Sequence, residues 1–381
     1  MRYGEGDRAA TLAGLGAYDL LIVSYGLLAQ DIDALAKVHF STAVLDEAQA
    51  IKNATTQRAK AARRISAACR VVTTGTPVEN HLGEIWSQMH FLNPGLLGGA
   101  KQFEERFGRP VQRDGDKEAA AQLRRLLRPF ILRRTKSQVL EELPPKTEIV
   151  LRVTPSGKEL AFYEAVRQRA LARVADGKAD AKQRMRLLGE LMRLRRAACH
   201  PRLVDPKTTI ESAKLEGLLE LIRELREAGH KALVFSQFVG HLTLVRERLD
   251  AANVVYQYLD GRTPTKKREA AVAAFQRGEG DLFLISLRAG GLGLNLTAAD
   301  YVIHLDPWWN PAVEDQASDR AHRIGQRRPV TIYKLVMAGT IEERILEMHG
   351  DKRELAAQLL AGSETSTTLS VEQLRELLQS A

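Results

Sequence analysis

The chain has 381 residues, 44% of them apolar, and a formal net charge of +9 that suggests a polyanionic partner. Its length allows two or three domain cores. The two cysteines, Cys69 and Cys199, stand far apart without partners at metal-ligand spacing, which argues against a disulfide framework and a zinc site. No apolar run approaches the ~20 residues of a membrane span, and no signal-peptide pattern occurs, so we expect a cytoplasmic protein without a membrane partner.

The positive charge is concentrated in two stretches. The first, from Leu123 to Gln138, has no acidic residue and contains Arg124, Arg125, Arg128, Arg133, Arg134 and Lys136. The second, from Ala181 to Leu203, has the single acid Glu190 and contains Lys182, Arg184, Arg186, Arg193, Arg195, Arg196 and Arg202. Each cluster suits a phosphate backbone, although such a charge run also describes an ordinary solvated helix face.

Short β-branched runs alternate with helical stretches, the pattern of parallel sheets covered by helices. The strands predicted in the first part are Tyr18–Ser24, Ser41–Leu45 and Arg70–Thr74. Those predicted in the last part are Ala232–Ser236, Val254–Leu259, Leu282–Ser286, Tyr301–Leu305 and Val330–Met337. Helical, basic sequence fills the interval from Pro94 to Pro206, apart from one predicted strand, Thr147–Val153. The predicted fold class is therefore α/β, with two parallel-sheet lobes and helical insertions between them.

Two carboxylates, Asp46 and Glu47, directly follow the apolar run that ends at Leu45. The carboxyl ends of parallel strands are where α/β sheets bind ligands. One carboxylate there can hold Mg²⁺ through its water shell, and the next can orient an attacking water. An Asp-Glu pair at a strand end also occurs by chance, so the pair alone does not decide the chemistry.

Two glycine-containing turns suit a phosphate. Thr74-Gly75-Thr76 follows a predicted strand and offers hydroxyls that can sense a phosphate, although a threonine-capped strand-to-helix turn has the same pattern. The segment Ser286–Leu296 contains Gly291 and Gly293, and glycines at this spacing free backbone N–H groups for anions.

The tract from Asp306 to Gln326 predicts a helix over residues 311–323. Asn310 suits the N-cap and Pro311 the first helical position. Gln316, Arg320 and Arg323 then fall at i, i+4 and i+7, so one helix face would present two arginines to a phosphate. A solvated helix with internal ion pairs is the alternative.

In order, these tracts resemble the helicase motifs of the Swi/Snf-type family of DNA translocases, over about residues 18–360. The motif-like segments are Leu45–Asn53, Thr74–Asn80, Leu233–Phe238, Ser286–Leu296 and Asp306–Gln326, and Val23–Gly26 resembles a DNA-contacting motif. The segments Phe130–Lys136 and Leu143–Lys146 resemble the family's inter-lobe segment, and Ala198–Pro201 its helical protrusion.

The resemblance implies two RecA-like lobes that bind ATP between them and duplex DNA across both. It implies that Asp46 holds Mg²⁺, Glu47 activates water, and Arg320 and Arg323 reach the γ-phosphate with support from Gln316. The further implied ATP contacts are Gln49, Thr74, Gly75, Thr76, Gly291 and Gly293. The implied DNA contacts are Ser24, Tyr25, Ser236, Gln237, Ser286, Arg288 and Asn295. The partners implied are double-stranded DNA and a DNA-bound protein such as RNA polymerase or a nucleoid protein, which would associate the chain with the nucleoid.

We expect five parts along the chain. They are a partial first lobe at 1–92, a protrusion and linker at 93–146, a second-lobe start with a protrusion at 147–213, the second lobe at 214–340, and a brace helix with a tail at 341–381. The phosphate-binding Gly-x-x-x-x-Gly-Lys-Ser/Thr loop does not occur in these residues. We therefore expect an incomplete first lobe and negligible ATPase activity from this polypeptide alone.

Two alternatives remain open. Unwinding helicases and RNA-dependent ATPases usually carry His-Arg-x-Gly-Arg in the last motif, whereas His322–Gln326 ends in glutamine. A non-catalytic DNA- or protein-binding module could use the basic helices and the second lobe without turning over ATP.

Overall fold

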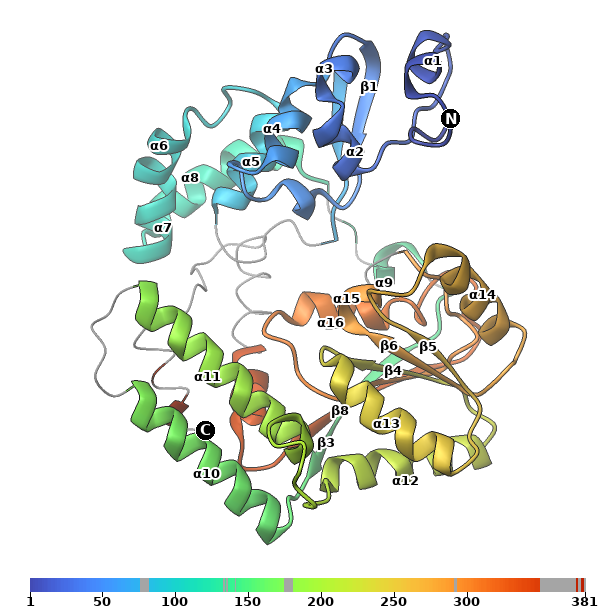
Figure 1. The fold of residues 1–381 in the computed structure, drawn as a ribbon. Coiled ribbons are helices and arrows are strands. Elements are labelled where there is room, and N and C mark those ends of the chain that lie inside the picture. Colours follow the sequence, from blue (N-terminus) through green and yellow to red (C-terminus); the bar gives the residue numbers. More distant parts are fainter. Residues whose placement is uncertain are drawn as a thin grey trace. The chain divides into compact units, whose positions relative to one another are not determined.

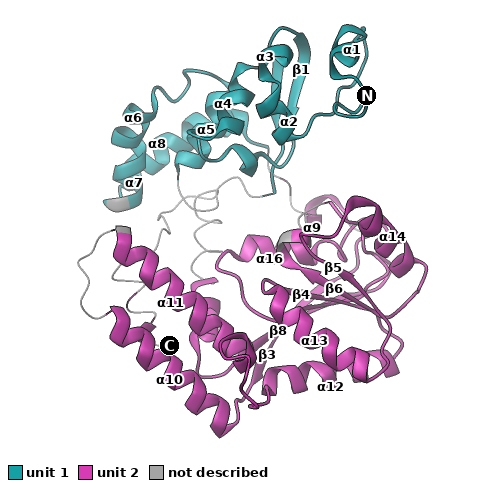
Figure 2. Cartoon of the chain, viewed as in Figure 1, with its two compact units in different colours: residues 1–132, 354–368 teal, residues 133–353, 369–381 magenta. Residues whose placement is uncertain are grey.

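The computed structural model describes residues 1–75, 82–132, 134, 136–140, 142–174, 181–290, 293–349, 375 and 378–379. These residues form two compact units (Figure 2). Unit 1 takes in Met1–Leu132, and unit 2 takes in Arg133–Arg353 together with the described C-terminal residues. The five-part division expected from the sequence stays a prediction.

Unit 1 is built on two parallel strands, β1 (His39–Leu45) and β2 (Ser66–Val72), with Leu45 paired opposite Val72 (Figure 1). The helical elements along this sheet are α1 (Arg8–Ala13), α2 (Tyr25–Gln30), α3 (Ile32–Leu35), a 3₁₀ turn (Ala48–Ile51) and α4 (Gln57–Arg64). A first apolar cluster centres on Leu35, Ile51 and Phe91.

A second apolar cluster of unit 1, around Phe103, Phe107 and Leu123, holds its helical second half together. The elements there are α5 (Gly83–Leu92), α6 (Ala100–Phe103), a π-helical turn (Glu104–Gly108), α7 (Arg109–Arg113), α8 (Lys117–Leu127) and a 3₁₀ turn (Arg128–Phe130).

Unit 2 contains a six-stranded parallel sheet in the order β3-β8-β7-β4-β6-β5. Its strands are β3 (Lys146–Val153), β4 (Ala232–Ser236), β5 (Tyr256–Leu259), β6 (Leu282–Ser286), β7 (Tyr301–His304) and β8 (Val330–Met337). The core strands β4 and β6 are buried along their whole length, which explains why they read as continuous apolar runs rather than alternating ones.

Helices cover both faces of this sheet (Figure 1). Ala232 and Val234 point into a cluster with α12 (Ala213–Glu227) and α13 (Val239–Ala251). Leu233 and Phe235 point into the opposite cluster, which includes residues of α14 (Thr265–Gln276), α15 (Leu287–Gly290) and α16 (Pro311–Ser318). Alternate side chains of one strand thus pack into two apolar clusters, one on each face of the sheet.

The remaining helices of unit 2 are α9 (Lys136–Val139), α10 (Gly157–Val174), α11 (Ala181–Cys199), a 3₁₀ turn (Pro201–Leu203) and a helix over residues 341–349. The antiparallel pair α10 and α11 shares an apolar cluster with Ile341, Ile345 and Leu378. Within the part of the chain that the structure describes, no helix combines the length and the apolar character needed to cross a membrane.

The α/β prediction and eight of the nine predicted strands are confirmed, with ends that shift by up to four residues. The strand predicted at Tyr18–Ser24 is wrong. That segment makes one isolated bridge, between Arg2 and Ile22, and Tyr18 adopts a left-handed φ of 71°. Its β-branched residues are strand-forming, but the described part of unit 1 offers it no ladder to join, and tertiary context overrides such propensity.

Candidate functional site

The carboxyl ends of β1 and β2 bring the predicted acidic residues of unit 1 to one place. The hydroxyl of Thr73 donates to Oδ1 of Asp46 at 2.7 Å, and the backbone N–H of Glu47 donates to the same oxygen at 3.0 Å. Asp46 is exposed, and both bonds use Oδ1, so Oδ2 is the oxygen that could reach a water of Mg²⁺. The donor set therefore fits the metal expected there.

Glu47 is held in an unusual backbone conformation, with φ 50° and ψ 53° in the left-handed region. Such a conformation is costly for a residue with a side chain and often marks a functional position. Nε2 of Gln49 donates to Oε2 of Glu47 at 2.6 Å, and Thr74 donates to Oε1 of Gln49 at 3.1 Å. A chain of contacts thus runs from the second carboxylate to the turn after β2.

Four further residues of unit 1 were predicted to contact ATP or DNA, and three of them lie in the part of the chain that the structure describes. Tyr25 donates its hydroxyl to the backbone oxygen of Asp46 at 2.8 Å. Burial, followed by the charges of Asp46 and Glu47, raises the pKa of Tyr25 to about 12. The hydroxyl of Ser24 caps α2 by accepting from the N–H of Leu27, Gly75 ends the described segment, and Thr76 lies outside the described residues.

Thr73 is a contact that the sequence analysis missed. It precedes the motif-like segment by one residue and lies within the predicted strand Arg70–Thr74. Side chains of a strand alternate between its two faces, so Thr73 and Thr74 point to opposite faces. That alternation could have indicated a separate contact for Thr73.

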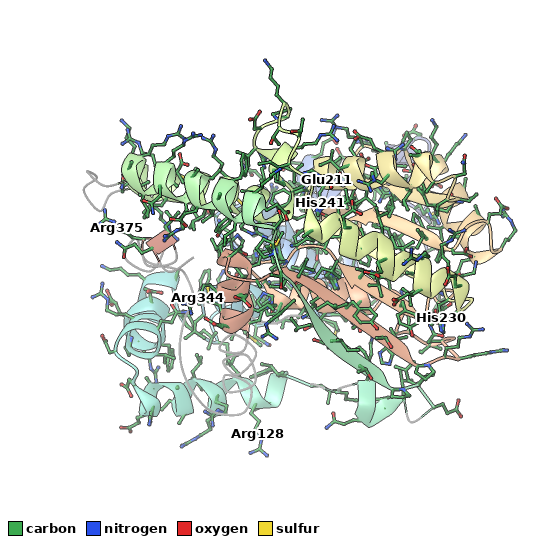
Figure 3. The ribbon with its side chains drawn as sticks, turned by 90° about the horizontal axis from the view of Figure 1, so that it is seen from below. Arg128, Glu211, His230, His241, Arg344 and Arg375 are labelled. Carbon is green, nitrogen blue, oxygen red and sulfur yellow. The ribbon has the colours of Figure 1, made fainter. Side chains whose placement is uncertain are left out.

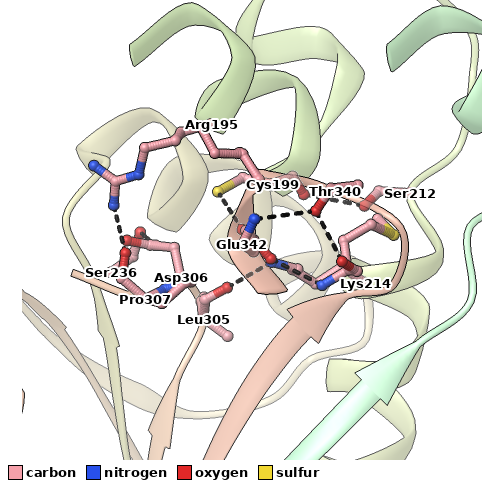
Figure 4. A network of polar contacts seen from close by, with 12 residues as sticks. Arg195, Cys199, Ser212, Lys214, Ser236, Leu305, Asp306, Pro307, Thr340 and Glu342 are labelled. Atoms are coloured by element: carbon pink, nitrogen blue, oxygen red, sulfur yellow. Dashed lines mark hydrogen bonds and ion pairs between the residues drawn. The ribbon is translucent and has the colours of Figure 1, made fainter. Parts of the chain in front are cut away.

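In unit 2, Asp306 at the end of β7 organises the carboxyl end of β4. Its Oδ1 accepts from the N–H of Gln237 at 3.1 Å, and its Oδ2 accepts from the hydroxyl of Ser236 (Figure 4). Ser236 is only 1% exposed and Ser286 is 4% exposed. Their burial leaves little side-chain surface for direct DNA contact, so we expect these two serines to orient their loops.

Arg195, from α11, clamps the same region. It is buried, donates to Oε1 of Gln237 at 2.9 Å and donates to the backbone oxygen of Pro307. Its guanidinium lies 5.0 Å from the ring centroid of Trp309, a cation–π distance. The basic stretch from Ala181 to Leu203 predicts a phosphate contact or a solvated position for Arg195, whereas the structure gives this side chain an internal role.

The arginine tract differs from its prediction in one respect. Asn310 caps α16 by accepting from the N–H of Ala312 at 3.1 Å, and Pro311 begins the helix, as predicted. However, α16 ends at Ser318, so the predicted helix over residues 311–323 is wrong. Gln316 is helical, whereas Arg320 and Arg323 lie in the following turns, Arg320 buried and Arg323 exposed.

The hydrogen-bond pattern changes where α16 ends. The N–H groups of Arg320 and Ala321 bond to oxygens three residues earlier, that of Ala317 at 3.2 Å and that of Ser318 at 3.1 Å, so the last turn is tighter than an α-helix. The turns that follow are held by two further contacts, because the oxygen of Arg320 accepts from the N–H of Leu296 at 3.0 Å and that of Ala321 accepts from Nε2 of Gln326 at 3.1 Å. A sequence period does not reveal these contacts.

The glycine-rich segment lies next to these turns, because Leu296 belongs to it. Gly293 has a φ of 67°, the left-handed region that glycine tolerates. Asn295 is exposed, and its backbone oxygen accepts from Gln276 at 2.8 Å. Gly291 lies outside the described residues, and the structure describes the backbone but not the side chain of Arg288.

Lys136, from the predicted inter-lobe segment, secures the arginine turns from another side. Its ammonium lies 2.8 Å from Oδ2 of Asp319 and donates to the backbone oxygen of His322 at 2.8 Å. Nε2 of His322 lies 2.8 Å from the oxygen of Pro144. Burial lowers the pKa of His322. The hydrogen bond to Pro144 acts to raise this pKa, and the charge of Lys136 lowers it further.

One other buried cluster could be mistaken for a metal centre. Cys199, His241 on α13 (Figure 3) and Asp306 each place one ligand atom within 4.8 Å of the others. Both oxygens of Asp306 already accept hydrogen bonds, and the thiol of Cys199 lies 3.6 Å from Oε1 of Glu342. Burial raises the pKa of Cys199 well above its ordinary value, so the group is a neutral thiol within this network.

A buried cation also occupies this network. Lys214 is fully buried, pairs with Glu342 and donates to the backbone oxygen of Leu305 at 3.0 Å (Figure 4). Burial acts to lower the pKa of Lys214, but the charge and hydrogen bond of Glu342, together with the charges of Cys199 and Asp306, raise it above its ordinary value. A metal ion would meet this charge at close range, so the cluster fits an internal polar network that joins α11, α12 and the strand ends.

Comparison with known proteins decides the family. The SNF2-related domain family matches residues 6–203, and the helicase conserved C-terminal domain family matches residues 213–325. The chain belongs to the SWI/SNF family of ATP-dependent helicases.

Individual relatives agree with this assignment. The Bacillus subtilis (strain 168) protein YwqA, named as an ATP-dependent helicase/translocase, is 38% identical over 367 residues, covering 94% of this chain and 40% of that protein. In Mus musculus, the SWI/SNF-related matrix-associated actin-dependent regulator of chromatin subfamily A member 1 is 37% identical over 346 residues, 87% of this chain and 33% of that protein. This chain therefore spans at most about 40% of the length of these curated relatives.

A solved structure supports the same fold. The Sulfolobus solfataricus SWI2/SNF2 ATPase core in complex with dsDNA is 34% identical and matches all of this chain and 81% of that chain, with a TM-score of 0.52. The parallel sheets of this SWI/SNF chain thus belong to RecA-like lobes, as the sequence resemblance implied.

Proposed function

We propose that this SWI/SNF chain is part of an ATP-driven motor that moves along double-stranded DNA and displaces or remodels bound protein. The observation that carries the proposal is the contact chain at the ends of β1 and β2, where Asp46 and Glu47 are fixed by Thr73 and Gln49. Fixed carboxylates at this position suit phosphoryl transfer to water, because catalysis there is mostly positioning and charge stabilisation.

Each group has a proposed task. Asp46 holds Mg²⁺ through water, and the metal supplies charge neutralisation on the triphosphate. Glu47 orients the attacking water, and the Gln49–Thr74 contact reports the state of the phosphate to the turn after β2. Arg320 and Arg323 stabilise the charge of the γ-phosphate, with Gln316 in support, and the turns that carry them are held by Lys136 and Gln326.

Duplex DNA is the nucleic acid that we propose the protein binds and moves along. Support comes from the Sulfolobus core, whose title describes a complex with dsDNA, and from the excess positive charge of this chain. Tyr25, Gln237, Arg288 and Asn295 are the proposed contact residues, and Ser24, Ser236 and Ser286 position them or their loops. The proposed protein partner is one that is bound to DNA, such as RNA polymerase or a nucleoid protein.

We also propose that a polypeptide of these 381 residues alone has negligible ATP turnover, because its sequence contains no phosphate-binding Gly-Lys-Ser/Thr loop. Without that loop the triphosphate lacks its main set of backbone donors, and Mg²⁺ lacks a hydroxyl ligand. The same feature supports a second candidate function, a DNA-binding module without turnover, since unit 2 has a complete sheet with both faces covered.

The test compares this chain with a chimera that carries the phosphate-loop segment of a SWI/SNF relative ahead of residue 6. We expect phosphate release from ATP in the chimera, stimulated by duplex DNA and abolished by Glu47→Gln. Duplex binding by the 381-residue chain without any turnover in either protein would favour the binding module instead.

A further inference from the structure

Helix α11 has two faces of opposite character. Leu187, Leu191 and Leu194 are buried in the cluster shared with α10. At 3.6 residues per turn, Lys182, Arg186, Gly189, Arg193 and Arg196 fall within an arc of about 80° on the opposite side. All five are exposed or half-buried.

The cations on this arc have no ion-pair partner among the residues of unit 2 that the structure describes. Among the described residues, no carboxylate lies within ion-pair distance of Lys182, Arg186, Arg193 or Arg196. The single acid of the helix, Glu190, pairs with Arg173 of α10 at 3.1 Å instead. Two other cations of the basic stretch are internal or paired, since Arg195 is buried and Arg202 lies 2.9 Å from Glu247. Arg184 is exposed but lies on another side of the helix, about 200° round the axis from Lys182.

Gly189, in the middle of the arc, provides an independent observation. Glycine inside a helix costs about 1 kcal/mol relative to alanine. A Cβ at Gly189 would meet nothing within 4 Å, so no described neighbour requires a glycine there. The gap does allow a ligand backbone to approach the helix between the flanking arginines.

The arc also leads directly to a proposed DNA contact. The guanidinium of Arg196 lies 5.8 Å from the ring centroid of Phe238, the residue after Gln237. Neighbouring Arg195 donates to the side chain of Gln237 at 2.9 Å. The basic arc is thus continuous with the carboxyl end of β4.

We propose that the α11 basic face, defined as Lys182, Arg186, Arg193 and Arg196, binds the phosphodiester backbone of duplex DNA and extends the track from Gln237 along the helix. The face is roughly 21 Å long, from the 14 rises of ~1.5 Å between Lys182 and Arg196. This length corresponds to about six base-pair steps of duplex at ~3.4 Å per step. The choice of duplex DNA as the ligand rests on the proposed function.

The test measures the affinity of the 381-residue chain for a duplex DNA oligonucleotide over a series of salt concentrations. The variant Lys182→Gln/Arg186→Gln/Arg193→Gln should make the slope of log K against log salt shallower by about 2.7, because each lost phosphate contact removes ~0.9. All three side chains point away from the core, so the thermal midpoint should stay near that of the wild type.

A matched variant distinguishes direct phosphate contacts of α11 from the general attraction of DNA to a positively charged protein. Arg223→Gln/Arg226→Gln/Arg248→Gln removes the same charge from α12 and α13, where each arginine has an acidic partner at 2.8–3.7 Å. Its slope should remain close to that of the wild type. Equal slopes for the two triple variants, or no change in the α11 variant, would overturn the proposal while leaving the proposed function intact.

Gly189 allows a charge-neutral test. Gly189→Leu should raise the thermal midpoint, because leucine favours the helix, yet weaken duplex binding several-fold, whereas Gly189→Ala should bind nearly as the wild type does. If Gly189→Leu binds duplex DNA as tightly as the wild type does, the DNA backbone does not approach the helix closely at this face.

Two outcomes bear on the ligand itself. Failure of the wild-type chain to bind duplex DNA would overturn both this inference and the proposed binding of duplex DNA. Tighter binding to an RNA duplex that depends on the α11 basic face would overturn DNA as the ligand.

Discussion

Gln326 contacts five backbone groups through one buried side chain. The two N–H hydrogens of its Nε2 are shared among the backbone oxygens of Thr297, Ala299 and Ala321, and its Oε1 accepts from the N–H groups of Arg327 and Arg328. In the sequence this glutamine served to distinguish two kinds of last helicase motif. The structure supplies a physical reason for the residue, because Gln326 joins the residues that directly follow the glycine-rich segment to the arginine turns.

Gln326→Ala should lower the free energy of unfolding by roughly 1–3 kcal/mol, because it leaves buried backbone groups without partners. Urea denaturation of the wild type and the variant measures this difference. Gln257→Ala is the matched control, since Nε2 of Gln257 makes one exposed bond, to the oxygen of Glu279 at 2.9 Å. Equal losses in the two variants would refute the structural role of Gln326.

His304, at the end of β7, should make stability depend on pH. It is 2% exposed, and burial lowers its pKa from 6.5 to about 4. The charge of Glu314 opposes this shift, and the charge of Lys334 adds to it. Between these values the unfolded chain binds a proton that the folded chain does not, so stability falls as pH drops from about 6.5 towards 4. The contribution is on the order of 3 kcal/mol.

The variant His304→Asn removes this proton site. We expect its unfolding free energy to fall less between pH 7 and pH 4.5 than that of the wild type. Because all other titrating groups are shared, the difference between the two proteins isolates His304. Parallel losses in both would show that the imidazole is protonated in the folded state.

At the scale of elements, buried strands were predictable and irregular ends were not. Ala232–Ser236 and Leu282–Ser286 match their predictions because strands covered on both faces are apolar at every position. The helix predicted through Arg323 was wrong because the chain tightens into turns after Ser318, where the N–H of Arg320 bonds to the oxygen of Ala317 three residues earlier. The acidic residues of the candidate site could be located from the sequence. The contacts that Thr73, Arg195 and Lys136 make could be identified only from the folded structure.

The two sheets should differ in local stability. In unit 1, β1 and β2 form a two-stranded parallel sheet on which Val44 is 58% exposed and Val71 is 39% exposed. In unit 2, β4 and β6 are central and fully buried. Parallel pairs rarely stand without cover on both faces, and poorly buried elements open first.

Hydrogen exchange followed by mass spectrometry tests this directly. Peptides that contain β1 and β2 should exchange faster, by about tenfold for each 1.4 kcal/mol of difference in opening free energy, than those that contain β4 and β6. Equal protection in the two sheets would mean that unit 1 is as stable as unit 2.

At the scale of the whole molecule, each unit presents part of the machinery of the proposed motor. Unit 1 carries two fixed carboxylates, and unit 2 carries the arginine turns and a basic helix face. Motif order in the sequence was enough to predict the family and the α/β fold, because the motifs follow strand ends. The sequence could not show which cations are internal, since burial depends on packing between distant elements.

The most direct test of this account is the rate of phosphate release from ATP, with and without duplex DNA, for the 381-residue chain and for the chimera that adds a phosphate loop. We expect no DNA-stimulated release from the chain alone. The chimera should show DNA-stimulated release that falls by ~10²-fold or more in Glu47→Gln, the usual contribution of a general base. Robust DNA-stimulated turnover by the chain alone, or equal rates for the chimera and its Glu47→Gln variant, would contradict the account.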